Sequence, residues 1–154
     1  MNLSAHVAVG ATVGYFTGNP ALGFVAGFLS HHVIDALPHT DGGSFKVNVK
    51  DFAKDIRIIK IVAIDLVLMT VIGLFLYTLH GFYLPMVLGA IGGAMPDIID
   101  NMPFWSPRLR KIFPFNYYHR FHEYFHFTIE NEKWLWTGIA TQIILILISF
   151  GLLV

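Results

Sequence analysis

The sequence predicts an all-α integral membrane protein, a helical bundle of two repeated hairpins followed by a His-rich interfacial helix and a C-terminal transmembrane helix. Hydrophobic residues make up 55% of the 154 residues and charged residues only 13%, whereas soluble domains carry roughly 25% charged residues. A chain of this length cannot bury so much apolar surface within itself, so lipid is expected to cover part of it. Ten basic residues balance ten acidic ones, which argues against a nucleic-acid partner.

The two hairpins are predicted to form one membrane domain with the rest of residues 1–154. The first repeat, residues 3–39, holds two apolar stretches separated by a Gly-Asn-Pro turn signal. A basic segment over residues 40–57 follows, and its second half has the spacing of a short surface helix. The second repeat, residues 58–103, opens with a long apolar helix that carries Asp65 about two turns in, where a charge usually faces protein or water. The second stretch of each repeat is rich in glycine, which allows close helix packing.

The clearest membrane span is residues 134–154. It is long enough to cross a hydrocarbon core of about 30 Å, and it begins with tryptophans typical of a membrane interface. Lysines and arginines gather in residues 40–57 and 101–120, whereas the connections at 17–20 and 80–83 hold none. The positive-inside rule then places both basic segments on the cytoplasmic side of the cell membrane.

A short pattern recurs at the end of each hairpin. His32-Val-Ile-Asp35-Ala-Leu-Pro38 aligns with Asp97-Ile-Ile-Asp100-Asn-Met-Pro103 at an offset of sixty-five residues. Each proline marks the end of a helix, because its ring removes a backbone hydrogen bond and clashes with the preceding turn. Chance and ordinary helix capping are the alternative explanations of so short a repeat. The shared cytoplasmic position of both copies favours a common role.

A His-rich helix is predicted over residues 116–130. At about 100° per residue, four potential ligands share one stripe of this helix: His119, His122, Glu123 and His126. Neutral imidazole and carboxylate groups suit zinc and other divalent transition metals. A polar or pH-responsive stripe at a membrane interface is the alternative interpretation.

Three clusters of potential ligands therefore converge on the cytoplasmic face. The candidate metal ligands are His6, His32, Asp35, His39, Asp97, Asp100, His119, His122 and His126. There is no cysteine, so any metal must be held by histidine and carboxylate. The count exceeds the ligands of one ion, which predicts one or two divalent ions, zinc before manganese or iron, with Asp35 or Asp100 as a bridge. His31 points about 100° away from His32 and is expected to support the ligands rather than to bind.

These motifs resemble a known family. The succession of His6, HHVIDALPH, GAIGGAMPDIID and HRFHEYFH is similar to the YdjM-like membrane-bound metal-dependent hydrolases, and more distantly to the helical zinc-dependent phospholipases C. That family typically has a Gly-rich helix ending in Pro-Asp-x-Asp-like residues, followed by a His-Arg-x-x-x-His segment. Here the pattern falls on Pro96, Asp97 and Asp100, and then on His119, Arg120 and His126. The likeness covers Ala5 to Phe127 and departs from the family at His122, Glu123 and the His-rich first repeat.

The resemblance implies a metal-dependent hydrolase of the cytoplasmic membrane. We expect a metal ion to lower the pKa of a bound water toward about 7 for attack on a phosphoester or a lipid ester. Glu123, or a non-bridging aspartate such as Asp100, is the candidate proton acceptor, and Arg120 is a candidate phosphate-binding residue. Aromatic residues around a site at headgroup level suggest membrane lipid as a partner and an amphiphilic substrate. A metal transporter or sensor would use the same ligands but needs a polar path across the bilayer, and a membrane scaffold would need no metal.

Overall fold

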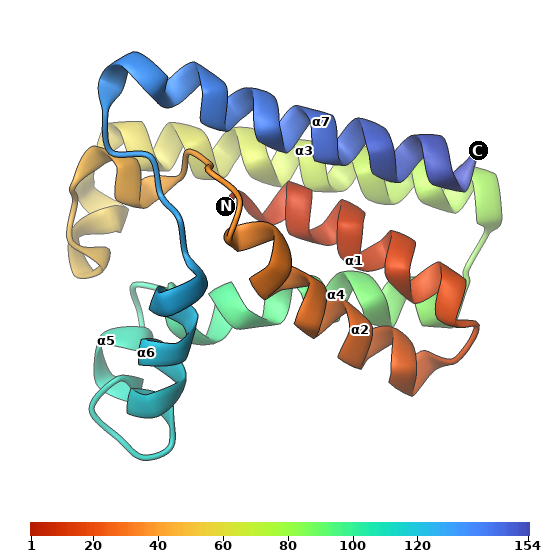
Figure 1. The fold of residues 1–154 in the computed structure, drawn as a ribbon, viewed down its shortest axis with the longest axis horizontal. Helices are drawn as coiled ribbons and strands as arrows, with labels where there is room; N and C mark the ends of the chain where they lie inside the picture. The colour runs from red at the N-terminus through yellow and green to blue at the C-terminus, as the bar shows by residue number, and fades with distance from the viewer.

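The computed structural model describes residues 1–154, apart from the side chain of Glu132. Within that description the chain is all-helical and has no strand, so the predicted fold class is confirmed at this level. The long helices are α1 (Leu3–Thr17), α2 (Pro20–Asp35), α3 (Ile56–His80), α4 (Leu84–Asp100) and α7 (Leu135–Leu153) (Figure 1). The shorter elements are η1 (Gly42–Phe45), η2 (Val49–Lys54), α5 (Ser106–Leu109), α6 (Phe115–Phe125) and η3 (Glu132–Trp134).

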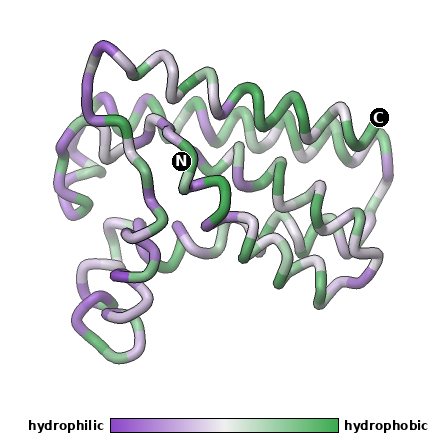
Figure 2. Tube along the Cα trace, viewed as in Figure 1, coloured by the Kyte–Doolittle hydropathy of each residue, from purple (hydrophilic) through white to green (hydrophobic). Residues whose placement is uncertain are grey.

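The two ends of the helix bundle differ in character. The turns after α1 and α3 lie at the same end as the C-terminus, whereas the segments after α2 and α4 lie at the opposite end (Figure 1). Hydrophilic residues gather at this opposite end, while α3 and α7 are hydrophobic over most of their length (Figure 2). The helices α2 and α4 both finish at the hydrophilic end, at Asp35 and Asp100. These two residues occupy equivalent positions in the sequence repeat, and each precedes its proline by three residues.

Glycines bring α1 and α2 against the backbone of α4. A Cβ atom built on Gly89 would lie 2.2 Å from the carbonyl oxygen of Gly10, and one built on Gly27 would lie 2.1 Å from the carbonyl oxygen of Gly89. No side chain fits at such distances, so the glycines set the spacing of the three helices. The close helix packing predicted from the Gly-rich stretches is confirmed.

Helix α3 packs against the rest of the molecule along one face only. Its buried residues are Ile58, Asp65, Ile72 and Leu76. The Asp65 carboxylate accepts hydrogen bonds from the backbone N–H groups of Leu3 (2.7 Å) and Ser4 (3.1 Å). Asp65 therefore caps the N-terminus of α1 from a neighbouring helix. The expectation that a charge at this depth faces protein is confirmed.

Helices α3 and α7 are long and apolar enough to cross a membrane. Most of their apolar side chains are exposed, as Ile64 on α3 and Leu147 on α7 illustrate at 62% each. Helices α1, α2 and α4 have 15, 16 and 17 residues, fewer than the roughly 20 that a perpendicular span requires.

The His-rich helix ends earlier than predicted. The sequence predicted a helix over residues 116–130, but α6 stops at Phe125 and His126 has an extended backbone with φ −91° and ψ 102°. The N–H of Phe127 donates to the carbonyl of Asp35 at the end of α2 (2.8 Å) instead of continuing the helix. His126 is therefore placed by contacts with the end of α2 and not by the helical stripe.

Candidate metal centre

The largest fully buried side chains of this protein are mostly ionisable. They are His6, His31, His39, His122, Asp35, Pro96 and Ser106. Histidines and aspartates are rarely buried so completely unless they are paired or bind a metal ion, because burial without a partner is costly. Most of these side chains meet where α1 begins and α2 and α4 end, beside α6. This buried polar cluster is the candidate functional site.

Four residues from α2, α4 and α6 form what we call the inner site: His31, Asp35, Asp97 and His122. Their ligand atoms all lie within 4.8 Å of one another. The Oδ2 atom of Asp35 lies 3.0 Å from Nε2 of His31 and 3.5 Å from Nε2 of His122. Asp97 Oδ1 lies 3.7 Å from the same nitrogen of His122. Two imidazoles and two carboxylates are a ligand set that suits zinc, manganese or iron.

The hydrogen bonds behind the two rings leave lone pairs facing the inner site. Nδ1 of His31 must donate to the carbonyl oxygen of Gly93 (2.8 Å), and Nδ1 of His122 donates to the Asp100 carboxylate (3.0 Å). A neutral imidazole that donates from Nδ1 has only a lone pair on Nε2. The two Nε2 atoms nevertheless lie 3.1 Å apart, and Oδ2 of Asp35 has no hydrogen-bond partner among the described residues. Two imidazole lone pairs and a carboxylate oxygen thus face one another, and a cation between them, either a proton or a metal ion, would remove their repulsion.

In the metal-free protein a proton on His122 is this cation. Burial lowers the pKa of His122, but its hydrogen bond to Asp100 and its contact with Asp35 outweigh burial and raise the pKa to about 9. At neutral pH a metal ion must therefore displace a proton from the inner site.

The metal-free protein is expected to lose stability as the pH rises. The folded-state pKa of His122, about 9, exceeds its ordinary value of 6.5, so the proton's contribution is fully present below about pH 6.5 and lost by about pH 9. The loss is at most about 3.5 kcal/mol, from roughly 1.4 kcal/mol per pKa unit. Thermal unfolding of chelator-treated protein should show a falling midpoint over this range, with a smaller fall in His122→Gln. Equal slopes in the two proteins would contradict the assignment.

A second group shares Asp35 with the inner site. This outer site consists of Asp35, His39 and His126 together with Asp41. Oδ2 of Asp41 lies 2.9 Å from Nε2 of His126 and 3.2 Å from Nε2 of His39, and Oδ1 of Asp35 lies 3.8 Å from His39. Burial raises the pKa of Asp41, but the contacts with His126 and His39 outweigh burial and hold the pKa well below its usual range. Asp35 therefore faces both sites: Oδ1 lies near His39, and Oδ2 lies near His31, His122 and, at 3.9 Å, His126, a place from which a carboxylate can bridge two ions.

Backbone pairing brings the two histidines of the outer site together. The N–H of His39 donates to the carbonyl of Phe127 (3.2 Å), and the carbonyl of His39 accepts from Ile129 (2.8 Å). The rings of His39 and His126 consequently stack, with centroids 4.8 Å apart. Nδ1 of His39 donates to the carbonyl of Leu37 (2.9 Å), which leaves its Nε2 directed at the carboxylates.

The start of α1 completes the cluster. Nε2 of His6 lies 3.2 Å from Oδ1 of Asp35 and 3.6 Å from Oδ2 of Asp97, and its ring stacks on His31 at 3.8 Å between centroids. The α-amino group of Met1 forms an ion pair with Asp35. The carboxylates thus already hold one cationic group, and an ion in the outer site would compete with it.

Asp100 lies beside the cluster and orients it. Its Oδ2 atom accepts hydrogen bonds from Nδ1 of His119 (2.9 Å) and Nδ1 of His122 (3.0 Å), and its Oδ1 atom accepts one from Arg110 (3.0 Å). A carboxylate behind a metal-binding imidazole fixes the tautomer and the orientation of the ring. These hydrogen bonds suit Asp100 to orient the two rings, and Asp100 is not among the four residues of the inner site. Arg110 is the arginine joined to the cluster, whereas Arg120 is exposed.

Three other predicted site residues lie around the two sites. His119 and the exposed Glu123 form a third group with Asp100, with ligand atoms within 4.8 Å of one another. His32 lies against aromatic rings of α2 and α6, and neither of its ring nitrogens has a hydrogen-bond partner among the described side chains. Its ring is close enough to His31 and His122 to form a group of three histidines with them.

His31, which was expected to support the ligands, lies in the inner site, and His32 forms a separate group with His31 and His122. His31 lies four residues before Asp35, one helical turn away, so both side chains project from the same face of α2 into the inner site. Sequence reasoning also missed Asp41 and Arg110. A signal for Asp41 was available, because it is a carboxylate two residues after His39 in the same loop. No comparable signal distinguished Arg110 from the neighbouring basic residues.

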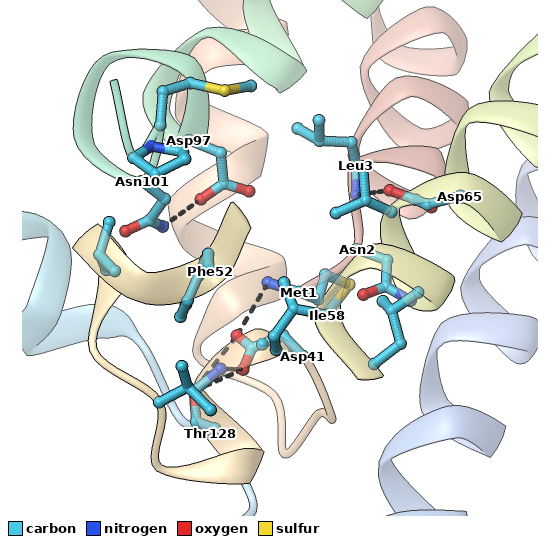
Figure 3. A pocket seen from close by; sticks show the side chains of 18 of the residues that line it. Met1, Asn2, Leu3, Asp41, Phe52, Ile58, Asp65, Asp97, Asn101 and Thr128 are labelled. Atoms are coloured by element: carbon cyan, nitrogen blue, oxygen red, sulfur yellow. Dashed lines mark hydrogen bonds and ion pairs between the residues drawn. The ribbon is translucent and has the colours of Figure 1, made fainter. Parts of the chain in front are cut away.

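The cluster opens into a cavity of about 860 Å³ between the end of α4, η2 and the first half of α3. Asp97 and Asp41 line this cavity from different sides, with Met1 between them (Figure 3). Glu123 and His126 also line it. A bound molecule can therefore reach the carboxylates of both sites from one space.

Comparisons with protein-family models, with curated proteins and with solved structures give no match for this chain.

Proposed function

We propose that this protein is a metal-dependent hydrolase of the cytoplasmic membrane that acts on a phosphoester or a lipid ester. The observation that carries the proposal is the inner site. Two imidazole nitrogens and two carboxylates face one another in a buried space, and hydrogen bonds behind both rings point their lone pairs inward. The resemblance of the sequence motifs to the YdjM-like hydrolases supports the same reaction class.

The ligands divide between two divalent ions. His31, Asp97 and His122 would hold an ion in the inner site, His39, Asp41 and His126 one in the outer site, and Asp35 would serve both. Bound divalent ions supply Lewis-acid activation of water and of a substrate oxygen. Zinc suits this mixture of nitrogen and oxygen ligands, and manganese and iron accept it as well.

Glu123 is the carboxylate best placed to move a proton. It lines the cavity with Asp41 and Asp97, but it is exposed and does not take part in the inner or outer site. We assign it the acceptance of a proton from the attacking water. The water oxygen forms the new bond to phosphorus or to the carbonyl carbon, the ester bond breaks, and Glu123 returns the proton to the leaving alkoxide. Asp100 holds His122 in place throughout.

The exposed surfaces of α3 and α7 support a place in the membrane. Val67 on α3 and Leu147 on α7 are each 62% exposed and have many apolar neighbours in the same state. A soluble monomer rarely exposes so extended an apolar surface. The opposite, hydrophilic end carries the lysines and arginines of residues 40–57 and 101–120, which the positive-inside rule assigns to the cytoplasm.

Single cysteines can test this orientation without background, because the chain has no cysteine. Lys54→Cys lies in the hydrophilic end, where the lysine side chain is 81% exposed, and Phe82→Cys lies between α3 and α4, where Phe82 is 72% exposed. A membrane-impermeant maleimide added to intact cells should label Phe82→Cys alone, and Lys54→Cys only after permeabilisation. The reverse pattern would contradict the proposed orientation.

Glu123→Gln is expected to lower turnover by about 10²–10⁴-fold, the usual contribution of a general acid or base. Its metal content should equal that of the wild type, because Glu123 belongs to neither the inner nor the outer site. The assay uses purified protein with bis(4-nitrophenyl) phosphate, 4-nitrophenyl phosphate and lipid esters, before and after chelation. Asp51→Asn, which makes the same change of carboxylate to amide at an exposed residue outside the cavity wall, is the control. Wild-type protein that retains its metal but hydrolyses none of these esters would favour metal transport or sensing.

A further inference from the structure

The cavity beside the cluster has walls of two kinds. Asp41, Asp97 and His126 line the part that meets the cluster, which we call the polar end. The wall along η2 and α3, which also includes Asp65, is called the apolar end. The remaining wall includes Phe52 of η2 and Ile58, Val62 and Leu66 of α3 (Figure 3 shows Phe52 and Ile58). A ligand that fits both ends must itself be polar at one end and apolar at the other. The cavity volume of about 860 Å³ lies within the range of roughly 300–1,000 Å³ found for small-molecule sites.

The apolar end of the cavity continues onto an exposed surface. Val62 and Leu66 are 51% and 55% exposed, and Phe104, which also lines the cavity, is 70% exposed. Leu66 lies about 12 Å further along α3 than Ile58, at about 1.5 Å per residue. In the proposed membrane placement, this direction runs from the cytoplasmic interface toward the bilayer centre. A lipid in the leaflet has the same polarity, with its head at the interface and its acyl chain running inward.

A small water-soluble ester would not match this wall. It would occupy the polar end and leave the apolar residues of α3 and η2 without a partner. An acyl chain covers them and removes apolar surface from water or loosely packed lipid. The continuity of the wall with the outer face of α3 also gives such a chain a lateral entrance beside Val62 and Leu66.

We propose that the substrate is an acyl-chain amphiphile. Its chain lies in the cavity between α3, η2 and the end of α4, and its ester or phosphoester group meets the cluster around Asp35. The proposal rests on the proposed function for the reaction. The binding of the chain is independent of turnover and can be measured separately.

The test uses the full-length protein in lipid nanodiscs that contain a lysophospholipid with a photoreactive diazirine in its acyl chain. Val62→Trp fills the cavity, whereas Ile64→Trp places the same side chain on the same helix at a residue that is 62% exposed and does not line the cavity. We expect cross-links on residues 58–66 to fall at least about fivefold in Val62→Trp and to be unchanged in Ile64→Trp. Equal cross-linking in the two variants would overturn the proposal.

A second measurement separates this proposal from the hydrolase function. Val62→Trp should keep the metal content of the wild type, while KM for a long-chain ester rises at least about fivefold more than KM for the water-soluble bis(4-nitrophenyl) phosphate. Cavity cross-links without hydrolysis of any ester would support the acyl-chain site and refute the hydrolase function. Hydrolysis with equal KM for the long-chain ester in both tryptophan variants would support the hydrolase function and refute the acyl-chain site.

Discussion

Asp35→Asn is expected to remove metal from both sites at once. The substitution keeps the shape of the side chain but removes the charge of the residue that, among the described side chains, belongs to both sites. Even the loss of a residue that merely supports a ligand lowers metal affinity by about 10–100-fold, so the loss of a shared charged ligand should lower it by at least about 10²-fold. The measurement is metal content by elemental analysis together with ester turnover, which should fall with the metal.

Two further variants define what this result means. Asp41→Asn removes a ligand of the outer site alone and should leave the inner ion in place. Asp51→Asn changes an exposed aspartate of η2, with a side chain that is 43% exposed, and should alter nothing. If Asp35→Asn retained as much metal as Asp51→Asn, Asp35 would not be a bridge.

Gly89→Ala is expected to destabilise the protein by about 3 kcal/mol or more, the upper range for overpacking. The new Cβ atom would lie 2.2 Å from a backbone carbonyl oxygen of α1, and backbone cannot rotate away as a side chain can. Because α1, α2 and α4 also carry His6, His31 and Asp97, a shift of this crossing would displace the ligands as well. Thermal unfolding in detergent should show a lower midpoint, or the protein should fail to accumulate in the membrane.

Gly73→Ala is the matched control for this prediction. It makes the same substitution inside a helix, but a Cβ atom on Gly73 of α3 meets nothing within 4 Å. Alanine is favoured over glycine in a helix by roughly 0.5–1 kcal/mol, so this variant should be as stable as the wild type or more stable. Similar unfolding midpoints for the two alanine variants would show that close approach at Gly89 does not hold the helices together.

The helices could be predicted from the sequence because their signals are local. Apolar stretches bounded by the turn at residues 18–20 and by Pro38 and Pro103 predicted α2 and α4 to within a few residues of their observed bounds. The end of α6 could not be predicted in this way. Its last turn is followed by backbone hydrogen bonds to Asp35 and His39, which lie far away in the sequence.

The sequence predicted which residues gather in the cluster, but not how they divide into an inner and an outer site. The repeat and the His-rich stripe identified Asp35, Asp97 and His122, because histidine and aspartate at helical spacing are visible in one segment. The place of His31 in the inner site depends on how α2 is rotated against α4, where glycine contacts bring the two helices together. The separation of an inner site from an outer site depends on the loop that carries His39 and Asp41, and no local pattern encodes where that loop lies.

The metal content per chain of the purified protein under metal-replete conditions tests the metal centre most directly. We expect two equivalents of a divalent ion, zinc before manganese or iron, with loss of the inner ion in His31→Ala/His122→Ala. No loss is expected in His80→Ala, which changes a histidine at the opposite end of the bundle. If the wild type bound one equivalent and the double variant bound none, the inner site would be supported and the outer site refuted. Folded wild-type protein without bound metal would contradict the central claim that this buried cluster is a metal centre.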